Sequence, residues 1–148
     1  MNLTVDKPAV KYMTTNLVLA LETMCINEIA REMKNFNVGA IPIVDNLESK
    51  RVVGIITDRD IVTRVIGNGI SPLITTAGDI MTRKVFTCKF SDPVVRVIAL
   101  MSMHRIRRIV ILNEQETIVG IISLDDLASH LGIPGTTADL AECISTRK

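Results

Sequence analysis

Residues 53–60, VGIITDRD, return further along the chain as residues 119–126, VGIISLDD. In both copies a short run rich in β-branched residues ends at a hydroxyl side chain, Thr57 or Ser123, and an aspartate follows three residues later. A run of this length and composition predicts a buried strand, and a hydroxyl residue before acidic positions predicts the start of a helix. The sequence therefore contains the same strand-to-helix junction twice.

The repeat extends well beyond this junction. A shift of 68 residues places Met13 and Thr14 on Met81 and Thr82, and after a two-residue deletion the shift becomes 66 for the junction itself. The same register aligns two helix faces with apolar residues at i, i+3, i+4 and i+7, namely Ile26, Ile29, Ala30 and Met33, and Val94, Val97, Ile98 and Met101. Such self-similarity indicates two copies of one supersecondary unit.

Each copy is predicted to fold as a βαββα unit. The expected elements are extended stretches at 17–19 and 85–87, helices at about 24–35 and 93–103, and strands at 40–44, 52–56, 108–112 and 118–122. Ser91 or Asp92 is expected to cap the second of these helices. The closing helices place Ile61, Val62 and Val65, and Leu127, Ala128 and Leu131, on apolar positions, and they are expected to end at 67–69 and at Gly132.

The predicted fold class is therefore α/β (α+β), with repeat 1 at residues 8–69 and repeat 2 at 76–132. A tail at 133–148 lies outside the repeat, and residues 139–144 are expected to add a helical turn. The core of one copy is too small to make that copy stable alone. Two copies are therefore expected to pack against each other about a pseudo-twofold axis.

Composition narrows the functional classes. Of 148 residues, 47% are hydrophobic but only 3% aromatic, which predicts an aliphatic core. The net charge of +1 argues against a dedicated nucleic-acid binder, and no apolar run approaches the ~18 residues of a membrane span. No signal peptide is recognisable at residues 1–10, and three isolated cysteines form no metal motif, so a cytoplasmic protein without a metal site is expected.

The duplicated junction fits the pattern G-h-h-[ST]-x-x-D, where h is a hydrophobic residue. In this it resembles the CBS (cystathionine-beta-synthase-type) domains, and residues 39–44, GAIPIV, look like that family's second strand. The resemblance covers about residues 8–132 and implies a CBS-domain pair, also called a Bateman module. Members of this family bind nucleotides and normally regulate an attached enzyme, channel or transporter. Any effector of this chain would then be a separate protein.

The residue types of the junction indicate a binding chemistry independently of the family resemblance. A Thr57 or Ser123 hydroxyl can cap its helix or donate to a phosphate, and the free N–H groups of a helix start favour an anion. Asp60 or Asp126 can accept hydrogen bonds from a ribose diol, as an acidic residue does in dinucleotide folds. The alternative is structural: the hydroxyls are simple caps and the aspartates complement the helix dipole.

The resemblance implies two nucleotide sites, each between the motif of one copy and the first and second strands of the other. Site A would combine Ile55, Thr57, Arg59 and Asp60 with Phe86, Ile106, Arg107 and Arg108. Site B would combine Ile121, Ser123 and Asp126 with Met13, Asn16, Val18, Val38 and Gly39.

The two sites differ in charge, because Arg107 and Arg108 correspond to Gly39 and Ala40 in the first copy. Guanidinium groups bind phosphate bidentately, so an arginine pair beside Thr57 favours AMP, ADP or ATP over adenosine or S-adenosylmethionine, with site A filling first. The alternatives are a solvated strand end or salt bridges to Asp58 or Asp125. The adenine nucleotide is expected as a regulatory ligand, with no cofactor.

The leading interpretation is a stand-alone, non-enzymatic regulatory module that binds adenine nucleotides and signals to a partner protein. A subunit-interaction scaffold with vestigial nucleotide sites is the main alternative. A nucleotide hydrolase lacks a recognisable general base, nucleophile or phosphate-binding loop, and nucleic-acid binding would depend on the basic residues 105–108. A homodimer is expected through exposed helix faces at Ile61 and Val65 and at Leu127 and Leu131.

Overall fold

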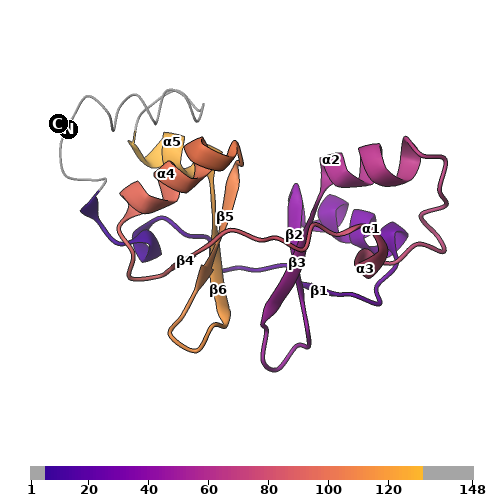
Figure 1. Ribbon diagram of the computed structural model, residues 1–148, viewed down its shortest axis with the longest axis horizontal. Coiled ribbons are helices and arrows are strands. Elements are labelled where there is room, and N and C mark those ends of the chain that lie inside the picture. Colours follow the sequence, from indigo (N-terminus) through magenta and orange to yellow (C-terminus); the bar gives the residue numbers. More distant parts are fainter. Residues whose placement is uncertain (1–5, 132–148) are drawn as a thin grey trace. The chain divides into compact units, whose positions relative to one another are not determined.

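The computed structural model describes residues 6–131, which form two compact units. Unit 1 joins the N-terminal segment up to Leu17 to the chain from Phe86 onward, and unit 2 is Val18–Val85. Each unit therefore takes most of one repeat together with the leading segment of the other. Figure 1 shows the elements of both units. The expected tail helix at 139–144, Gly132 and Cys143 lie outside the described residues.

Unit 2 is a three-stranded sheet with its helices on one face (Figure 1). The order is β1-β2-β3, with β1 parallel to β2 and β2 antiparallel to β3. Its elements are β1 (Ala20–Leu21), α1 (Ile26–Phe36), β2 (Ala40–Val44), β3 (Val52–Thr57), α2 (Asp58–Asp60), the π-helix η3 (Ile61–Ile66) and α3 (Ala77–Ile80).

Unit 1 repeats this plan, with sheet order β4-β5-β6 and the same parallel and antiparallel pairing. Its elements are the 3-10 helix η2 (Ala9–Lys11), β4 (Thr87–Lys89), α4 (Val94–His104), β5 (Arg108–Leu112), β6 (Ile118–Ser123) and α5 (Leu124–Leu131). The predicted α/β (α+β) class with two tandem βαββα units is confirmed.

Both cores are aliphatic, as the composition predicts. The helix faces found by periodicity point inward: Ile26 and Ile29 in α1, and Val94 and Val97 in α4, are fully buried. They pack against strand residues such as Ile41 and Ile56 in unit 2, or Ile109 and Ile122 in unit 1. Non-directional burial of branched side chains thus supplies the main stabilisation of each unit.

Each unit contains the leading segment of the other repeat: the chain up to Leu17 in unit 1 and the chain that ends at Val85 in unit 2. We call these the exchanged segments, and each pairs with the last strand of the unit that contains it. Thr14 and Ile121 exchange two backbone hydrogen bonds of 2.9 and 3.1 Å, and Thr82 and Ile55 exchange two of 3.0 Å. These bridges extend β6 and β3 on their free edges. The leading segment of each repeat is therefore an integral part of the sheet formed by the other repeat.

Motif glycines make this pairing possible. A β-carbon at Gly120 would lie 2.5 Å from Met13 Sδ and 2.9 Å from Met13 Cβ. At Gly54 it would lie 2.5 Å from Met81 Sδ and 3.1 Å from the Thr82 carbonyl oxygen. The glycine of the repeated motif is thus required where the methionine of the exchanged segment crosses the strand.

The same segments satisfy the starts of the first helices. Val94 N–H donates to the Lys7 carbonyl at 2.8 Å, and Ile26 N–H donates to the Thr75 carbonyl at 2.9 Å. Backbone carbonyls thus replace side-chain caps, which leaves Pro93 and Cys25 at the N-cap positions. The prediction that Ser91 or Asp92 caps this helix is wrong, because the Asp92 carboxylate accepts from Lys89 N–H at 2.8 Å instead.

Three further expectations need correction. The first strands begin later than predicted, at Ala20 and Thr87. The closing helix of repeat 1 is a short α-helix that continues as a π-helix, and Val62 on it is 60% exposed. Ile61, Val65 and Leu127 do not form exposed faces, because each is buried in the core of its own unit.

Candidate functional site

The strand-to-helix junction of unit 1 brings several predicted residues together. Ser123 ends β6 and its Oγ accepts a hydrogen bond of 3.0 Å from Asp126 N–H in the first turn of α5. On the neighbouring strand Arg108 is the residue paired with Ser123, and Leu124 N–H donates to the Arg107 carbonyl at 2.8 Å. The arginine pair therefore lies directly beside the Ser123 motif.

The charged groups of this junction are unequally engaged. Arg107 Nη2 lies 3.1 Å from Asp125 Oδ1, with both side chains well exposed, so one of the predicted structural alternatives holds for Arg107. Within residues 6–131, no ion pair or side-chain hydrogen bond engages the Arg108 guanidinium or the Asp126 carboxylate. A half-buried cation and a half-buried anion thus remain available at one helix start.

Unit 1 also carries half-buried apolar side chains among the predicted site residues. Met13, Phe86 and Ile106 pack against the rim of the unit 1 core, and Ile121 precedes Ser123 by two residues on β6. The Phe86 ring stacks on the His104 imidazole, with centroids 3.9 Å apart and planes 21° from parallel. Partly exposed apolar surface beside a few polar groups is the usual make-up of a small-molecule site.

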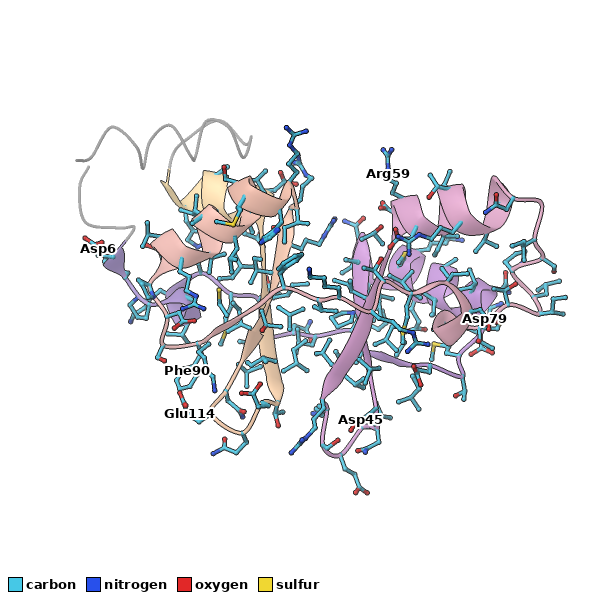
Figure 2. The ribbon with its side chains drawn as sticks, in the orientation of Figure 1. Asp6, Asp45, Arg59, Asp79, Phe90 and Glu114 are labelled. Carbon is cyan, nitrogen blue, oxygen red and sulfur yellow. The ribbon has the colours of Figure 1, made fainter. Side chains whose placement is uncertain are left out.

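The corresponding junction of unit 2 is more tightly closed. Thr57 and Asp60 form a capping box: Asp60 N–H donates to Thr57 Oγ1 at 3.1 Å, and Thr57 N–H donates to Asp60 Oδ2 at 2.9 Å. The structural alternative considered for this motif is therefore realised here. Arg59 points away from the sheet (Figure 2), and positions 39 and 40 carry no charge.

The structure distributes the predicted site residues by unit. Unit 1 holds Met13, Asn16, Phe86, Ile106, Arg107, Arg108, Ile121, Ser123 and Asp126, and unit 2 holds Val18, Val38, Gly39, Ile55, Thr57, Arg59 and Asp60. Sites A and B as predicted each combine residues of both units, so those combinations stay predictions. Arg108 pairs with Ser123 within unit 1, and the expectation that site A fills first stays a prediction.

Sequence reasoning missed three residues at these junctions: Thr14, Arg64 and Thr82. The threonines pair with Ile121 and Ile55. The repeated Met-Thr dipeptide was a signal for them, because it recurs at the repeat period opposite the repeated motif glycine. No comparable signal marks Arg64, whose counterpart at the 66-residue shift is His130.

Two absences apply to the part of the chain that is described. Residues 6–131 contain no group of three or more His, Cys, Asp or Glu side chains placed to hold a metal ion. None of the helices there has the length and apolar character needed to cross a bilayer.

Comparison with known proteins gives consistent matches. Protein YlbB of Bacillus subtilis is 37% identical over 116 residues, which is 78% of this chain and 76% of YlbB. Among solved structures, the CBS domain pair of protein MJ0100, in complex with 5′-methylthioadenosine and S-adenosyl-L-methionine, matches with a TM-score of 0.75 and 28% identity. The match covers 85% of this chain and 96% of that chain.

A hexameric CBS-CP12 protein from bloom-forming cyanobacteria matches with a TM-score of 0.72 and 27% identity, over 81% of this chain and 65% of that chain. The family model for the CBS domain matches twice, at residues 9–67 and 77–133. Each of these two matches contains one of the repeated junctions, and together they span most of the chain. The chain therefore belongs to the CBS domain family, as a tandem pair.

Proposed function

We propose that this CBS pair is a regulatory module that binds an adenine nucleotide at the unit 1 junction and signals to a separate partner protein. One observation carries the proposal: Arg108 pairs with Ser123 across β5 and β6, beside an Asp126 carboxylate that has no partner among the described residues. This junction offers a cation for phosphate, a carboxylate for a ribose diol and apolar surface for a base.

The adenosine part of the ligand has support from a relative. The MJ0100 CBS pair, which shares this fold, is in complex with two ligands that both contain adenosine. Base recognition would use backbone groups and apolar contacts beside Met13 and Ile106, so side-chain identity there does not select the base.

The phosphate part is supported by the basic character of unit 1. Arg105, Arg107 and Arg108 lie within four consecutive residues at the end of α4 and the start of β5, and only Arg107 has an ion-pair partner in the described chain. Guanidinium groups that converge repel one another, and an anion bound between them would relieve that repulsion. AMP, ADP or ATP should therefore bind better than adenosine, and better than S-adenosylmethionine, whose sulfonium would meet like charge.

A ligand screen tests the proposal. The thermal unfolding midpoint is measured with AMP, ADP, ATP, adenosine, S-adenosylmethionine, NAD and GTP. A ligand that binds only the folded state raises this midpoint, so a phosphorylated adenosine should give the largest increase. Equal shifts with AMP and adenosine, or the largest shift with S-adenosylmethionine, would contradict the phosphate site. No shift with any of them would favour a scaffold with vestigial sites.

We further propose a cytoplasmic homodimer as the working form. The free thiols of Cys25 and Cys88 fit a reducing compartment. In unit 2 the exposed aliphatic side chains Val62 and Ile66 lie one turn apart on η3, at 60% and 58% exposure. They replace the buried Ile61 and Val65 as the candidate interface, because paired exposed apolar side chains on a small chain favour association.

A further inference from the structure

One guanidinium in unit 2 links the carboxylate expected to bind a ribose to the exchanged segment. Arg64 Nη1 donates to the Thr82 hydroxyl at 2.9 Å and to the Ile80 carbonyl at 2.8 Å. Its Nη2 lies 3.5 Å from Asp60 Oδ1. Arg64 therefore joins the carboxylate of the Thr57 motif to the exchanged segment that pairs with β3.

In this arrangement Arg64 faces the Asp60 carboxylate, whose oxygens are the acceptors that a ribose diol would need. A diol binds a carboxylate by donating hydrogen bonds to it, and arginine carries only donors. Asp60 Oδ2 already accepts from Thr57 N–H at 2.9 Å, and Oδ1 faces Arg64. Each oxygen of Asp60 thus faces a donor of the protein, so a ribose at this carboxylate would compete with Arg64 for Oδ1.

Unit 1 lacks this arrangement at the equivalent position. His130 replaces Arg64, and its Nδ1 lies 2.8 Å from the Asp126 backbone carbonyl rather than from the carboxylate. The His130 ring packs edge-on against Tyr12, with centroids 5.5 Å apart. Within the described residues the Asp126 carboxylate is left without a hydrogen-bond or ion-pair partner.

We propose that Arg64 is a specificity-determining residue that closes the unit 2 junction to nucleotide, so that each chain binds one nucleotide tightly, in unit 1. The inference rests on the proposed function, because it concerns the second of two equivalent junctions. It assigns the difference at the carboxylate to one side chain: Arg64 pairs with Asp60 in unit 2, whereas the Asp126 carboxylate has no such partner among the described residues of unit 1.

Calorimetric titration with AMP tests the proposal. The wild type should bind one equivalent, and Arg64→Gln should add a second, because glutamine is too short to span Asp60 and Thr82. Displacing a charged hydrogen-bonding group costs affinity, so the second site should tighten by about ten-fold or more. In an Asp126→Ala background, where unit 1 is silenced, adding Arg64→Gln should restore one binding site.

A matched control is available in the same unit. Arg83 Nη1 donates to Glu22 Oε1 at 2.9 Å and its Nη2 donates to the Gly78 carbonyl at 3.1 Å, and neither contact involves Asp60 or Thr82. Arg83→Gln should therefore leave the AMP titration unchanged in both backgrounds. Arg64→Lys keeps a cation on η3 but cannot bridge three groups, so it should give a smaller gain in AMP affinity at the second site. It serves as the test if the circular dichroism spectrum shows that Arg64→Gln does not fold.

The outcomes separate this inference from the proposed function. Two equivalent sites in the wild type, or a folded Arg64→Gln variant that titrates like the wild type, would overturn the role of Arg64 while leaving nucleotide binding intact. If neither the wild type nor the Arg64 variants bind AMP, the proposed function fails as well.

Discussion

Asp126 is the residue on which ribose recognition depends in this account. Asp126→Ala should weaken AMP binding by about 1.5–3 kcal/mol, or about 10- to 150-fold, because a charge-assisted hydrogen bond to the diol is lost. Asp60→Ala should have a much smaller effect, since the Asp60 carboxylate is already engaged by Thr57 N–H and Arg64. Calorimetry on both variants checks this, and equal losses would return the two aspartates to equivalent roles.

Cys88 should be chemically inert in the folded protein. Burial in unit 1 raises the pKa of its thiol to about 11, so at pH 8 only about one molecule in a thousand carries the reactive thiolate. Iodoacetamide at pH 8 should leave the Cys88 peptide unmodified in native protein and alkylate it in denaturant, as read by mass spectrometry. Rapid alkylation under native conditions would mean that the β4 region opens readily.

At the scale of elements, the exchanged segment and the motif glycine should behave as one packing unit. Gly120→Ala places a methyl group against Met13 and should destabilise the fold by about 1–3 kcal/mol. Met13→Ala removes the obstructing side chain, so the double variant should recover part of that loss. Urea unfolding of the four proteins measures the coupling free energy. Strictly additive effects would show that the two residues do not meet.

The hairpin loop after β2 should make folding stability depend on acid. The Asp45 carboxylate accepts from the Ser49 hydroxyl and from Asn46 and Arg51 N–H groups, and these bonds lower its pKa. Its contribution is therefore present above the unfolded pKa of about 4 and is lost as pH falls through the lower folded value. Figure 2 places Asp45 at the loop end of the β2–β3 hairpin.

Asp45→Asn isolates this effect. The urea midpoint of the wild type should fall more steeply between about pH 5 and pH 3 than that of the variant, because asparagine does not titrate in this range. An identical pH dependence in both proteins would show that the loop carboxylate makes no titratable contribution.

Most elements follow from local sequence, and the errors lie where tertiary contacts decide. The helix faces at Ile26 and Val94 and the strands at 40–44 and 108–112 were predictable, because burial imposes its period on the sequence. The capping of the helix starts was not predictable. The N–H groups there donate to the Lys7 and Thr75 carbonyls, which lie in segments remote in sequence.

The candidate residues could be singled out from the sequence, and their grouping into sites A and B stays a prediction. Both motifs were found because their residue types recur in register, and the arginine pair because it departs from the repeat, which has Gly39 and Ala40 at these positions. Strand pairing within unit 1 places Arg108 beside Ser123, and that neighbour depends on which strands pair. Periodicity carries no information about that choice, and it does not reveal the contacts of Arg64 with Ile80 and Thr82 either.

At the scale of the whole molecule, the account predicts a dimer formed through η3. Light scattering should give about twice the chain mass of 16.3 kDa at tens of micromolar. Val62→Glu with Ile66→Glu should shift the mass to that of the monomer, because two charges would be buried in an apolar contact. Leu47→Glu, at a similarly exposed loop position, serves as the control and should remain dimeric. A monomeric wild type would exclude this interface.

We expect Arg108, beside the Ser123 motif, to bind the phosphate of an adenine nucleotide. Calorimetry with AMP and adenosine on Arg108→Ala checks this, with Arg96→Ala as control, since exposed Arg96 is paired with Asp92 at 3.8 Å rather than with the Ser123 motif. Arg108→Ala should lose about 10- to 150-fold in AMP affinity and leave adenosine unchanged, while Arg96→Ala changes neither. Equal affinities for AMP and adenosine in the wild type, or an unaltered AMP affinity in Arg108→Ala, would contradict the account.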